Sequence, residues 1–219
     1  MDHNLEFFRG KRVLVTGHTG FKGTWLTFLL KEVGAEVMGY ALSPETGSSH
    51  FKLLGMQEKM NHVVGDVRDS SNLNAAMQSF QPDIVFHLAA QALVKKSYED
   101  PAITFDTNVM GSVNLLDAVR HCSTVRSLVY ITSDKCYENL EWVWGYRETD
   151  KLGGHDPYSA SKAAAEIAFS SYARSFLVSR PTLGAATARA GNVIGGGDWA
   201  EAVSYTHLRA HETPEHLVC

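Results

Sequence analysis

The chain has 219 residues, of which 44% are hydrophobic and 20% charged, a mix typical of a globular domain with a sizeable core. Its net charge is -4 at pH 7 and it has no long Lys/Arg run, which argues against nucleic acid or an anionic membrane as the main partner. No apolar run is long enough to span a bilayer, and the first residues lack the layout of a secretory signal. Three irregularly spaced cysteines predict no disulfide framework and a reducing, cytoplasmic location.

Short apolar runs alternate with helical patterns along most of the chain. The first run, RVLVTG, is followed by the helix-like GTWLTFLLKEVG, which closes on Gly34. The runs are apolar throughout rather than alternating, as expected for strands with both faces covered. We therefore predict an α/β fold with a doubly wound parallel sheet, a Rossmann arrangement. Strands are expected at residues 12–17, 35–42, 62–66, 83–90, 127–133 and 186–192, and the main helices at 23–34, 70–80, 108–122 and 158–175.

The first strand runs into VTGHTGFKG, in which Gly17, Gly20 and Gly23 stand at the turn and at the start of a helix. Gly17 permits a tight turn, Gly20 lets backbone approach a pyrophosphate, and Gly23 lets the helix lie against the strand. The helix start also offers N–H groups and partial positive charge to phosphates. This strand–turn–helix context indicates a dinucleotide site, with a ligand-free glycine turn as the alternative.

The residues that would bind the adenosine half of a dinucleotide are less clear. No acid ends the second strand, where a partner for the ribose hydroxyls is expected, and Glu45 is the nearest. No arginine stands there to clamp a 2′-phosphate, so NAD is favoured over NADP without being derived. Asp66 follows the third strand and could accept a hydrogen bond from the adenine amino group. An ordinary turn at the strand end is equally compatible with this spacing.

Two groups of polar residues point to proton chemistry. YSASK places Tyr158 and Lys162 on one helix face, where the ammonium is expected to lower the pKa of the phenol. Tyr158 could then take a proton from a substrate hydroxyl while hydride leaves the same carbon, and Lys162 could hold the cofactor ribose. In ITSDKCYEN the fifth strand runs directly into Ser133, Asp134 and Lys135. These three either form an ordinary polar loop or supply a hydroxyl, an acid and an amine to one site.

Several stretches together resemble one known family. They cover essentially all of residues 8–201 and read VTGHTGFKG, GDVRD, HLAAQ, TNVMGSVNLL, ITSDKCYEN, YSASK and ARAGNVIGGGDW. On these the chain resembles the extended short-chain dehydrogenase/reductases and, within them, closely resembles the CDP-glucose 4,6-dehydratases. SDKCYEN and GNVIGGGDW discriminate best, because neither is a general feature of dinucleotide-binding folds. The resemblance implies NAD as cofactor, a nucleotide-sugar substrate, no metal, and a role in deoxysugar and O-antigen biosynthesis.

The resemblance also implies roles for individual residues. Ser133 would hydrogen-bond the sugar 4-hydroxyl, Arg189 and Asn192 would face the sugar-nucleotide phosphates, and Asn108 would support the central helix and the active-site water. Each has a plain structural alternative, such as a strand end, a turn cap or a flexible glycine loop. The residues implied to line the cofactor groove are Gly17, Gly20, Phe21, Gly23, Asp66, Val67, Leu88, Ala89, Ala90, Gln91, Asn108, Thr132, Tyr158 and Lys162.

The implied reaction converts CDP-glucose to CDP-4-keto-6-deoxyglucose and water through transient oxidation at carbon 4. Elimination across carbons 5 and 6 needs an acid and a base, which would be Asp134 and Lys135. The lysine departs from the Asp-Glu pair of the dTDP-glucose dehydratases, and it would need burial or nearby cations to be neutral. The alternative is an ion pair that only shapes the pocket. A nucleotide-sugar 4-epimerase or reductase would need no such pair, and a non-catalytic NAD-binding protein is a further alternative.

The last residues differ in character from the rest. Residues 202–219 lack clear periodicity, and VSYTHLRAHET can be encoded by a transposon-end adapter used in DNA library preparation. We therefore expect a dinucleotide-binding domain at 1–201 and a non-native tail, in which the His207/His211 spacing carries little weight as a metal site. Family members carry a substrate-binding region beyond this point and pair as homodimers through a helix bundle. We accordingly expect this chain to bind dinucleotide weakly and to turn over CDP-glucose little or not at all.

Overall fold

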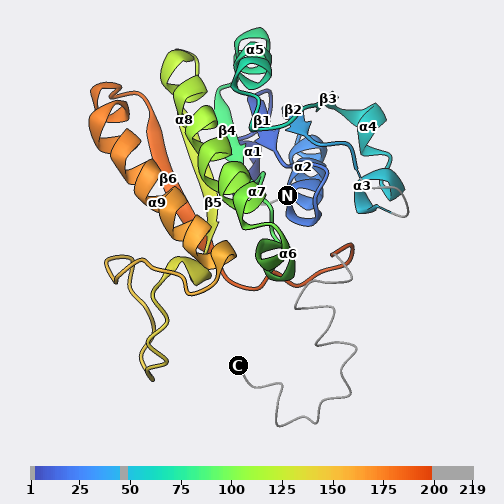
Figure 1. Ribbon diagram of the computed structural model, residues 1–219. Helices are drawn as coiled ribbons and strands as arrows, with labels where there is room; N and C mark the ends of the chain where they lie inside the picture. Colours follow the sequence, from blue (N-terminus) through green and yellow to red (C-terminus); the bar gives the residue numbers. More distant parts are fainter. Residues whose placement is uncertain (1–2, 45–48, 199–219) are drawn as a thin grey trace.

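The predicted strands form one six-stranded parallel sheet in the computed structural model, which describes residues 3–44 and 49–198 (Figure 1). The strand order, β3-β2-β1-β4-β5-β6, is that of a doubly wound dinucleotide-binding sheet, so the predicted fold class is confirmed. The order reverses between β1 and β4, and such sheets bind ligands outside the carboxyl ends of the strands at this point. The strands are β1 Arg12–Thr16, β2 Glu36–Ala41, β3 Asn61–Val64, β4 Ile84–His87, β5 Ser127–Ser133 and β6 Gly184–Ala190.

Strand register brings the predicted site residues to one edge of the sheet. Thr16 at the end of β1 pairs with His87 at the end of β4, and Ser133 at the end of β5 pairs with Ala190 at the end of β6. The glycine loop, the HLAAQ segment and the SDKCYEN turn follow these strands directly. All three therefore emerge at the carboxyl edge of the sheet.

Helices cover both faces of the sheet (Figure 1). On β1, Leu14 belongs to a core cluster with residues of three helices, α5 (Ser70–Phe80), α8 (Gly111–His121) and α9 (Pro157–Ser175). Val13 and Val15 belong to a second cluster with Leu30 of α2 (Phe21–Glu32). All three strand residues are fully buried, which explains why β1 shows no polar alternation. The α-helices are α1 His3–Glu6, α2 Phe21–Glu32, α3 His50–Leu53, α4 Met56–Lys59, α5 Ser70–Phe80, α6 Val94–Glu99, α7 Pro101–Phe105, α8 Gly111–His121 and α9 Pro157–Ser175, with a π-helical turn η1 Asp106–Met110 and 3-10 turns η2 Asp134–Cys136 and η3 Leu177–Ser179.

The two outer strands depart from the expectation of cover on both faces. β3 has exposed residues at both of its ends, and β6 alternates between exposed and half-buried residues over most of its length. Both strands form edges of the described sheet, where less of the described chain packs against them. β3 also ends at Val64, so Gly65 and Asp66 of the predicted strand belong to the loop that follows.

Local chemistry sets the helix boundaries. α2 begins directly after Gly20, earlier than predicted, and Gly34 follows its end with a φ of 85°. Asp156 caps α9 by accepting a hydrogen bond from a first-turn backbone N–H at 2.9 Å. The helix predicted at 108–122 begins instead with the π-helical turn η1, which leads into α8.

Some sequence predictions lie outside the described residues. These are Glu45, the His207/His211 pair and the tail at 202–219. Within residues 3–44 and 49–198, no helix is long and apolar enough to cross a membrane. Within the same ranges, no group of three or more His, Cys, Asp or Glu side chains could hold a metal ion.

Candidate active site

The loop between β1 and α2 depends on glycines that have no side chain. Gly17 adopts a φ of 74°, and a Cβ on it would lie 2.7 Å from the backbone nitrogen of Ala89. A Cβ on Gly23 would collide with the carbonyl oxygen of Gly17, so only glycine lets α2 approach the loop this closely. Gly20 is less constrained, at 3.4 Å from the same oxygen, and it leaves the first turn of α2 without a side-chain cap. Uncapped N–H groups at a helix start fit a dinucleotide pyrophosphate.

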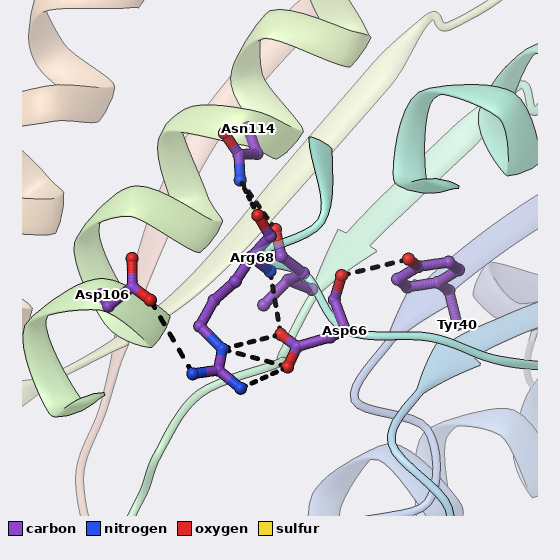
Figure 2. A network of polar contacts seen from close by, with 6 residues as sticks. Tyr40, Asp66, Arg68, Asp106 and Asn114 are labelled. Atoms are coloured by element: carbon purple, nitrogen blue, oxygen red, sulfur yellow. Dashed lines mark hydrogen bonds and ion pairs between the residues drawn. The ribbon is translucent and has the colours of Figure 1, made fainter. Parts of the chain in front are cut away.

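Asp66 lies in the loop after β3, beside the end of β2 (Figure 2). The Tyr40 hydroxyl donates to the Asp66 carbonyl oxygen at 3.1 Å, and Arg68 holds both oxygens of the carboxylate. The hydrogen-bonded Arg68 guanidinium keeps the pKa of Asp66 below its usual value, so the carboxylate is an acceptor at neutral pH. The next predicted cofactor residue, Val67, is buried and packs tightly against Gly111 of α8.

The loop after β4 is held in place by β1 and by η1. The backbone N–H groups of Leu88 and Ala89 donate to the Thr16 hydroxyl at 3.2 and 3.3 Å. The Gln91 N–H donates to the Asn108 side-chain oxygen at 2.8 Å, and the Asn108 amide donates back to the Gln91 carbonyl at 3.1 Å. The residues predicted to line the nicotinamide side of the groove are all half-buried in this loop: Leu88, Ala89, Ala90 and Gln91.

Asn108 connects this loop to the helix that carries the catalytic candidates. Its amide also donates to the Ser161 hydroxyl at 2.8 Å, and that hydroxyl donates to the Tyr158 carbonyl oxygen at 2.6 Å. Asn108 is 1% exposed and lies within η1, a kind of helical irregularity that is frequent at functional sites. It therefore links the loop after β4 to the start of α9 through a buried amide.

A buried chain of hydrogen bonds beneath the site is absent from the sequence predictions. The His87 ring shares hydrogen bonds with the hydroxyls of Thr16 at 2.6 Å and Ser112 at 3.2 Å, and Ser112 meets the Tyr130 hydroxyl at 2.5 Å. Burial lowers the pKa of His87 to about 3 and raises the pKa of Tyr130, so both rings stay neutral. The sequence signal is weak, since it consists of a histidine and a tyrosine inside otherwise apolar strands.

Tyr158 and Lys162 lie on the first turns of α9, next to the end of β5. The Lys162 ammonium lies over the Tyr158 ring, 5.9 Å from its centroid. Burial, aided by the charge of Lys22, lowers the pKa of Lys162 to about 8. Burial also raises the pKa of Tyr158, an effect that a hydrogen bond with Ser133 opposes and nearby carboxylates reinforce. The expectation of a lowered phenol pKa is therefore wrong for the polypeptide by itself, because burial raises the pKa of Tyr158 although Lys162 lies beside the ring.

Ser133, Asp134 and Lys135 form the end of β5 and the start of η2. The Ser133 hydroxyl donates to Asp134 Oδ1 at 3.1 Å and accepts from the Lys135 backbone N–H at 3.2 Å. The side chains of Asp134 and Lys135 are exposed, and no salt bridge joins them in the part of the chain that the structure describes. The geometry thus gives no support to a structural ion pair. Of the two conditions named for a neutral Lys135, burial or nearby cations, burial is not met, because the side chain is exposed.

Arg189 on β6 is engaged by the protein. Its guanidinium pairs with Glu166 of α9 at 3.0 Å and donates to the Tyr137 hydroxyl at 2.8 Å and the Glu148 carbonyl at 3.0 Å. The hydrogen bond with Glu166 raises the pKa of Arg189 further above its usual value. Of the two residues predicted to face phosphates, Arg189 is therefore held in an internal network, and Asn192 is exposed beyond the end of β6.

Glu166 is the buried acid of this network, and sequence reasoning missed it. It is 4% exposed, and besides Arg189 it accepts hydrogen bonds from the hydroxyls of Thr132 and Thr187. The predicted cofactor residue Thr132 thus directs its hydroxyl toward α9. The signal that could have found Glu166 is an acid one turn after Lys162 in the alanine-rich stretch KAAAE, on the face of α9 that meets the sheet.

An open pocket of about 900 Å³ adjoins Asp134 and Lys135. It lies between β6, the start of α9 and the loop after η2, and the stacked rings of Tyr137 and Tyr146, 5.0 Å apart, line one side. Cys136 in η2 lies beneath this surface, fully buried, and burial raises the pKa of its thiol to about 11. A thiol in this state is unreactive at neutral pH.

Two sequence comparisons bear on this site. A family model described as GDP-mannose 4,6 dehydratase matches residues 14–183. A curated CDP-glucose 4,6-dehydratase from Salmonella typhimurium is 52% identical over 200 residues, which make up 90% of this chain and 56% of that protein. The chain therefore spans little more than half the length of this curated relative.

Solved structures show the same architecture. A UDP-glucose 4-epimerase from Thermus thermophilus, in complex with NAD, matches with a TM-score of 0.76 and 32% identity, over 90% of this chain and 60% of that one. A dTDP-glucose 4,6-dehydratase from Streptomyces venezuelae, with NAD and TYD bound, matches with a TM-score of 0.77 and 25% identity, over 90% of this chain and 61% of that one. The chain therefore shares its fold with these two nucleotide-sugar enzymes and spans about 60% of the length of each.

Proposed function

This chain belongs to the GDP-mannose 4,6 dehydratase family, and we propose that it forms the dinucleotide-binding and catalytic part of a CDP-glucose 4,6-dehydratase. The proposed reaction converts CDP-glucose to CDP-4-keto-6-deoxyglucose and water. The 52% identity to the Salmonella typhimurium CDP-glucose 4,6-dehydratase supports this substrate. A CDP-paratose 2-epimerase from Salmonella typhi is only 30% identical.

NAD is the proposed cofactor, and the NAD complex of the similar epimerase structure supports it. Gly17, Gly20 and Gly23 would hold the pyrophosphate at the start of α2, and at Gly17 and Gly23 the close approach of neighbouring backbone leaves no space for a side chain. Asp66 would accept from the adenine amino group, and residues 88–91 would line the nicotinamide side. When bound, NAD supplies the site with a hydride acceptor that later returns the hydride.

Tyr158 is the proposed base for the sugar 4-hydroxyl, with Ser133 as its hydrogen-bond partner. Because burial raises the pKa of Tyr158, its phenol is a proton donor in the resting protein and needs nearby positive charge before it can act as a base. The oxidised nicotinamide of bound NAD would add its positive charge to that of Lys162, whose pKa of about 8 leaves most of it protonated at pH 7. The Asn108–Ser161 contact holds the backbone of Tyr158 in place for this step.

Asp134 in its protonated form is the proposed acid for the departing 6-hydroxyl, and Lys135 in its neutral form is the proposed base at carbon 5. The Ser133 hydroxyl orients the Asp134 carboxylate through its hydrogen bond at 3.1 Å. Lys135 is exposed, so it can act as a base only once bound sugar nucleotide excludes water from it. In this scheme Arg189 and Asn192 would meet the substrate phosphates, and Arg189 would have to exchange one of its internal contacts to do so.

The observation that carries the proposal is the position of Asp134 and Lys135 directly after Ser133 at the end of β5. A 4-epimerase or a reductase needs the hydroxyl, the tyrosine and the lysine of α9 but no elimination pair. An acid and an amine beside those groups therefore favour a dehydratase. The same proposal assigns residues 1–201 to the dinucleotide-binding domain, the protein to the cytoplasm as a homodimer, and the product to deoxysugar and O-antigen synthesis.

The test is the fate of deuterium placed at carbon 4 of CDP-glucose, with NAD and the protein expressed from its complete gene. A dehydratase moves the label to carbon 6 of a 4-keto-6-deoxy product. Tyr158→Phe should abolish this transfer, and Asp134→Asn should slow water loss by roughly 100-fold or more while NADH still forms. A hexose that keeps its 6-hydroxyl and carries the label at carbon 4 would show an epimerase instead. NAD binding with no change to CDP-glucose would indicate a non-catalytic NAD-binding protein.

A further inference from the structure

The backbone of the loop that follows β3 is held in place by contacts with β2. The Gly65 N–H donates to the Ala41 carbonyl of β2 at 2.8 Å, and the Asp66 carbonyl accepts from the Tyr40 hydroxyl at 3.1 Å and the Asp69 N–H at 3.0 Å. A Cβ on Gly65 would collide with the Tyr40 ring, so the loop is pressed directly onto that ring. The backbone of Asp66 is therefore fixed from both sides.

The Asp66 carboxylate is fixed as well, by three donor groups of Arg68. The Arg68 backbone N–H donates to Oδ1 at 2.9 Å, Nε donates to both oxygens at 3.0 and 3.1 Å, and Nη2 donates to Oδ2 at 2.5 Å. This two-pronged contact sets the plane of the carboxylate as well as its position. The Nε contact is shared between the oxygens, which leaves part of the acceptor capacity of the carboxylate for a further donor.

Arg68 is in turn anchored to the helical layer behind it, as Figure 2 shows. Its Nη1 lies 3.8 Å from the Asp106 carboxylate, at the start of η1. The Asn114 amide of α8 donates to the carbonyl oxygens of Val67 and Arg68 at 3.0 and 3.1 Å. The guanidinium is thus held between the loop and η1, and its direction is set by groups outside its own loop.

We infer that Arg68 is a positioning residue for the adenine end of the cofactor, where it orients the Asp66 carboxylate to accept a hydrogen bond from the adenine amino group. The inference rests on the proposed binding of NAD. A carboxylate that only accepts hydrogen bonds selects a base with an amino group over one with an oxo group at the same place. Arg68 strengthens this preference for an amino group, because a carboxylate that is free to rotate would discriminate less between an amino and an oxo group.

Two other roles for Arg68 fit the contacts less well. A purely stabilising ion pair would gain little at this site, because the side chains are 34% and 25% exposed. A clamp for the 2′-phosphate of NADP would need a cation at the end of β2. Arg68 instead follows β3, and its charge already faces two carboxylates, Asp66 and Asp106.

The experiment compares the dissociation constants of NAD and nicotinamide hypoxanthine dinucleotide, which has an oxo group in place of the adenine amino group. Wild-type protein from the complete gene should bind NAD about tenfold more tightly than the analogue. Arg68→Met should lower this ratio to about two, because NAD binding weakens while binding of the analogue changes little. Equal weakening of both ligands in Arg68→Met, or an unchanged ratio, would overturn the inference.

Three controls separate orientation from charge and from folding. Arg68→Lys keeps the positive charge but loses the paired Nε and Nη2 donors, so it should restore only part of the preference for NAD over the analogue. A full return to the wild-type ratio would overturn the geometric role. Arg120→Met removes an arginine of similar exposure, 33%, that pairs with Asp117 at 2.8 Å on α8, and it should leave the ratio unchanged. Nicotinamide mononucleotide, which lacks the adenosine half, should bind wild type and Arg68→Met equally. A loss of its binding in Arg68→Met would contradict a role at the adenine end.

The wild-type measurements keep this inference distinct from the proposed function. Failure of wild-type protein to bind NAD at all would refute the proposed cofactor. Tight NAD binding with a ratio near one would leave the cofactor in place and overturn only the inference about Arg68 and Asp66.

Discussion

The two halves of the carboxyl edge of the sheet are built in different ways. Beyond β1 and β3, backbone packs against backbone or ring, and an added Cβ would collide at Gly17, Gly23 and Gly65. Beyond β4 to β6, the space is filled by buried ionisable side chains such as Lys162 and Glu166, which are 5% and 4% exposed. The three glycines of the nucleotide half should therefore respond to side-chain volume, whereas Lys162 and Glu166 of the catalytic half should respond to charge and pH.

The largest expected effect is the loss of Glu166 from the catalytic half. Glu166→Ala would leave the Arg189 guanidinium, whose side chain is 16% exposed, without its carboxylate, and we expect the free energy of unfolding to fall by up to roughly 3–5 kcal/mol. Urea unfolding measures this. The matched control is Glu138→Ala, which removes an ion pair with the 73% exposed Lys151 and should cost under about 1 kcal/mol. Similar losses in the two variants would contradict the contrast between the halves.

Lys162→Met should act in the opposite direction and depend on pH. The folded-state pKa of Lys162, about 8, lies below the usual 10.5, so burial destabilises the charged form. This destabilisation is fully present below pH 8 and is relieved as pH rises toward 10.5. The substitution should therefore stabilise the fold by up to roughly 3 kcal/mol at pH 7, with the gain shrinking between pH 8 and 10.5. Unfolding curves across this range test it, with the exposed Lys151→Met as a control that should show no such trend.

In the nucleotide half, Gly23→Ala should destabilise through volume alone. The new methyl group would press on the Gly17 carbonyl, and we expect a loss of about 1–3 kcal/mol that is unchanged between pH 6 and 8. NAD affinity should fall as the loop shifts. Gly20→Ala, whose Cβ would have 3.4 Å to the same oxygen, should be much milder. If both variants lose the same stability, close packing of this loop is not the cause.

The smallest expected effect is at Asp156, which caps α9. Burial raises the pKa of Asp156, but its hydrogen bonds with Ser159 and with the backbone of Asp156 and Tyr158 together outweigh burial, so the folded-state pKa lies below the usual value. The contribution is present at neutral pH and is lost as pH falls through the folded-state pKa. Asp156→Ala should cost about 1 kcal/mol at pH 7, and Asp156→Asn, which can still cap, should cost less. An equal loss in both variants would show that the charge matters more than the cap.

The contrast also explains which parts of the fold could be predicted. Apolar runs such as RVLVTG and glycine spacing such as VTGHTGFKG report backbone requirements, and both occur at fixed sequence distances. The strands and the loop before α2 were therefore predictable. The short helices α3 and α4 were not, because runs of four residues are too brief to show a period. Nor was η1, since a π-helical turn keeps the composition of a helix.

The site was predictable only where its residues are neighbours in the sequence. Tyr158 and Lys162 share one helix, and Ser133 to Lys135 are consecutive. The partnership of Glu166 with Arg189 spans 23 residues, and that of Thr16 with His87 spans 71, so spacing carries no information about them. The direction of a pKa shift was harder still, because burial is a property of the whole fold. This is why the expected lowering of the Tyr158 pKa is wrong, since burial raises it.

Alkylation of Cys136 can report how often the catalytic half opens. Its sulfur is fully buried in η2, the turn that also carries Asp134 and Lys135, and its raised pKa of about 11 keeps it in the thiol form. An alkylating reagent can therefore reach Cys136 only during moments when η2 detaches from the sheet. The rate at which the Cys136 sulfur is alkylated would then measure how often η2 opens, without any substitution in the protein. A bound ligand that stabilises η2 would lower the alkylation rate of Cys136.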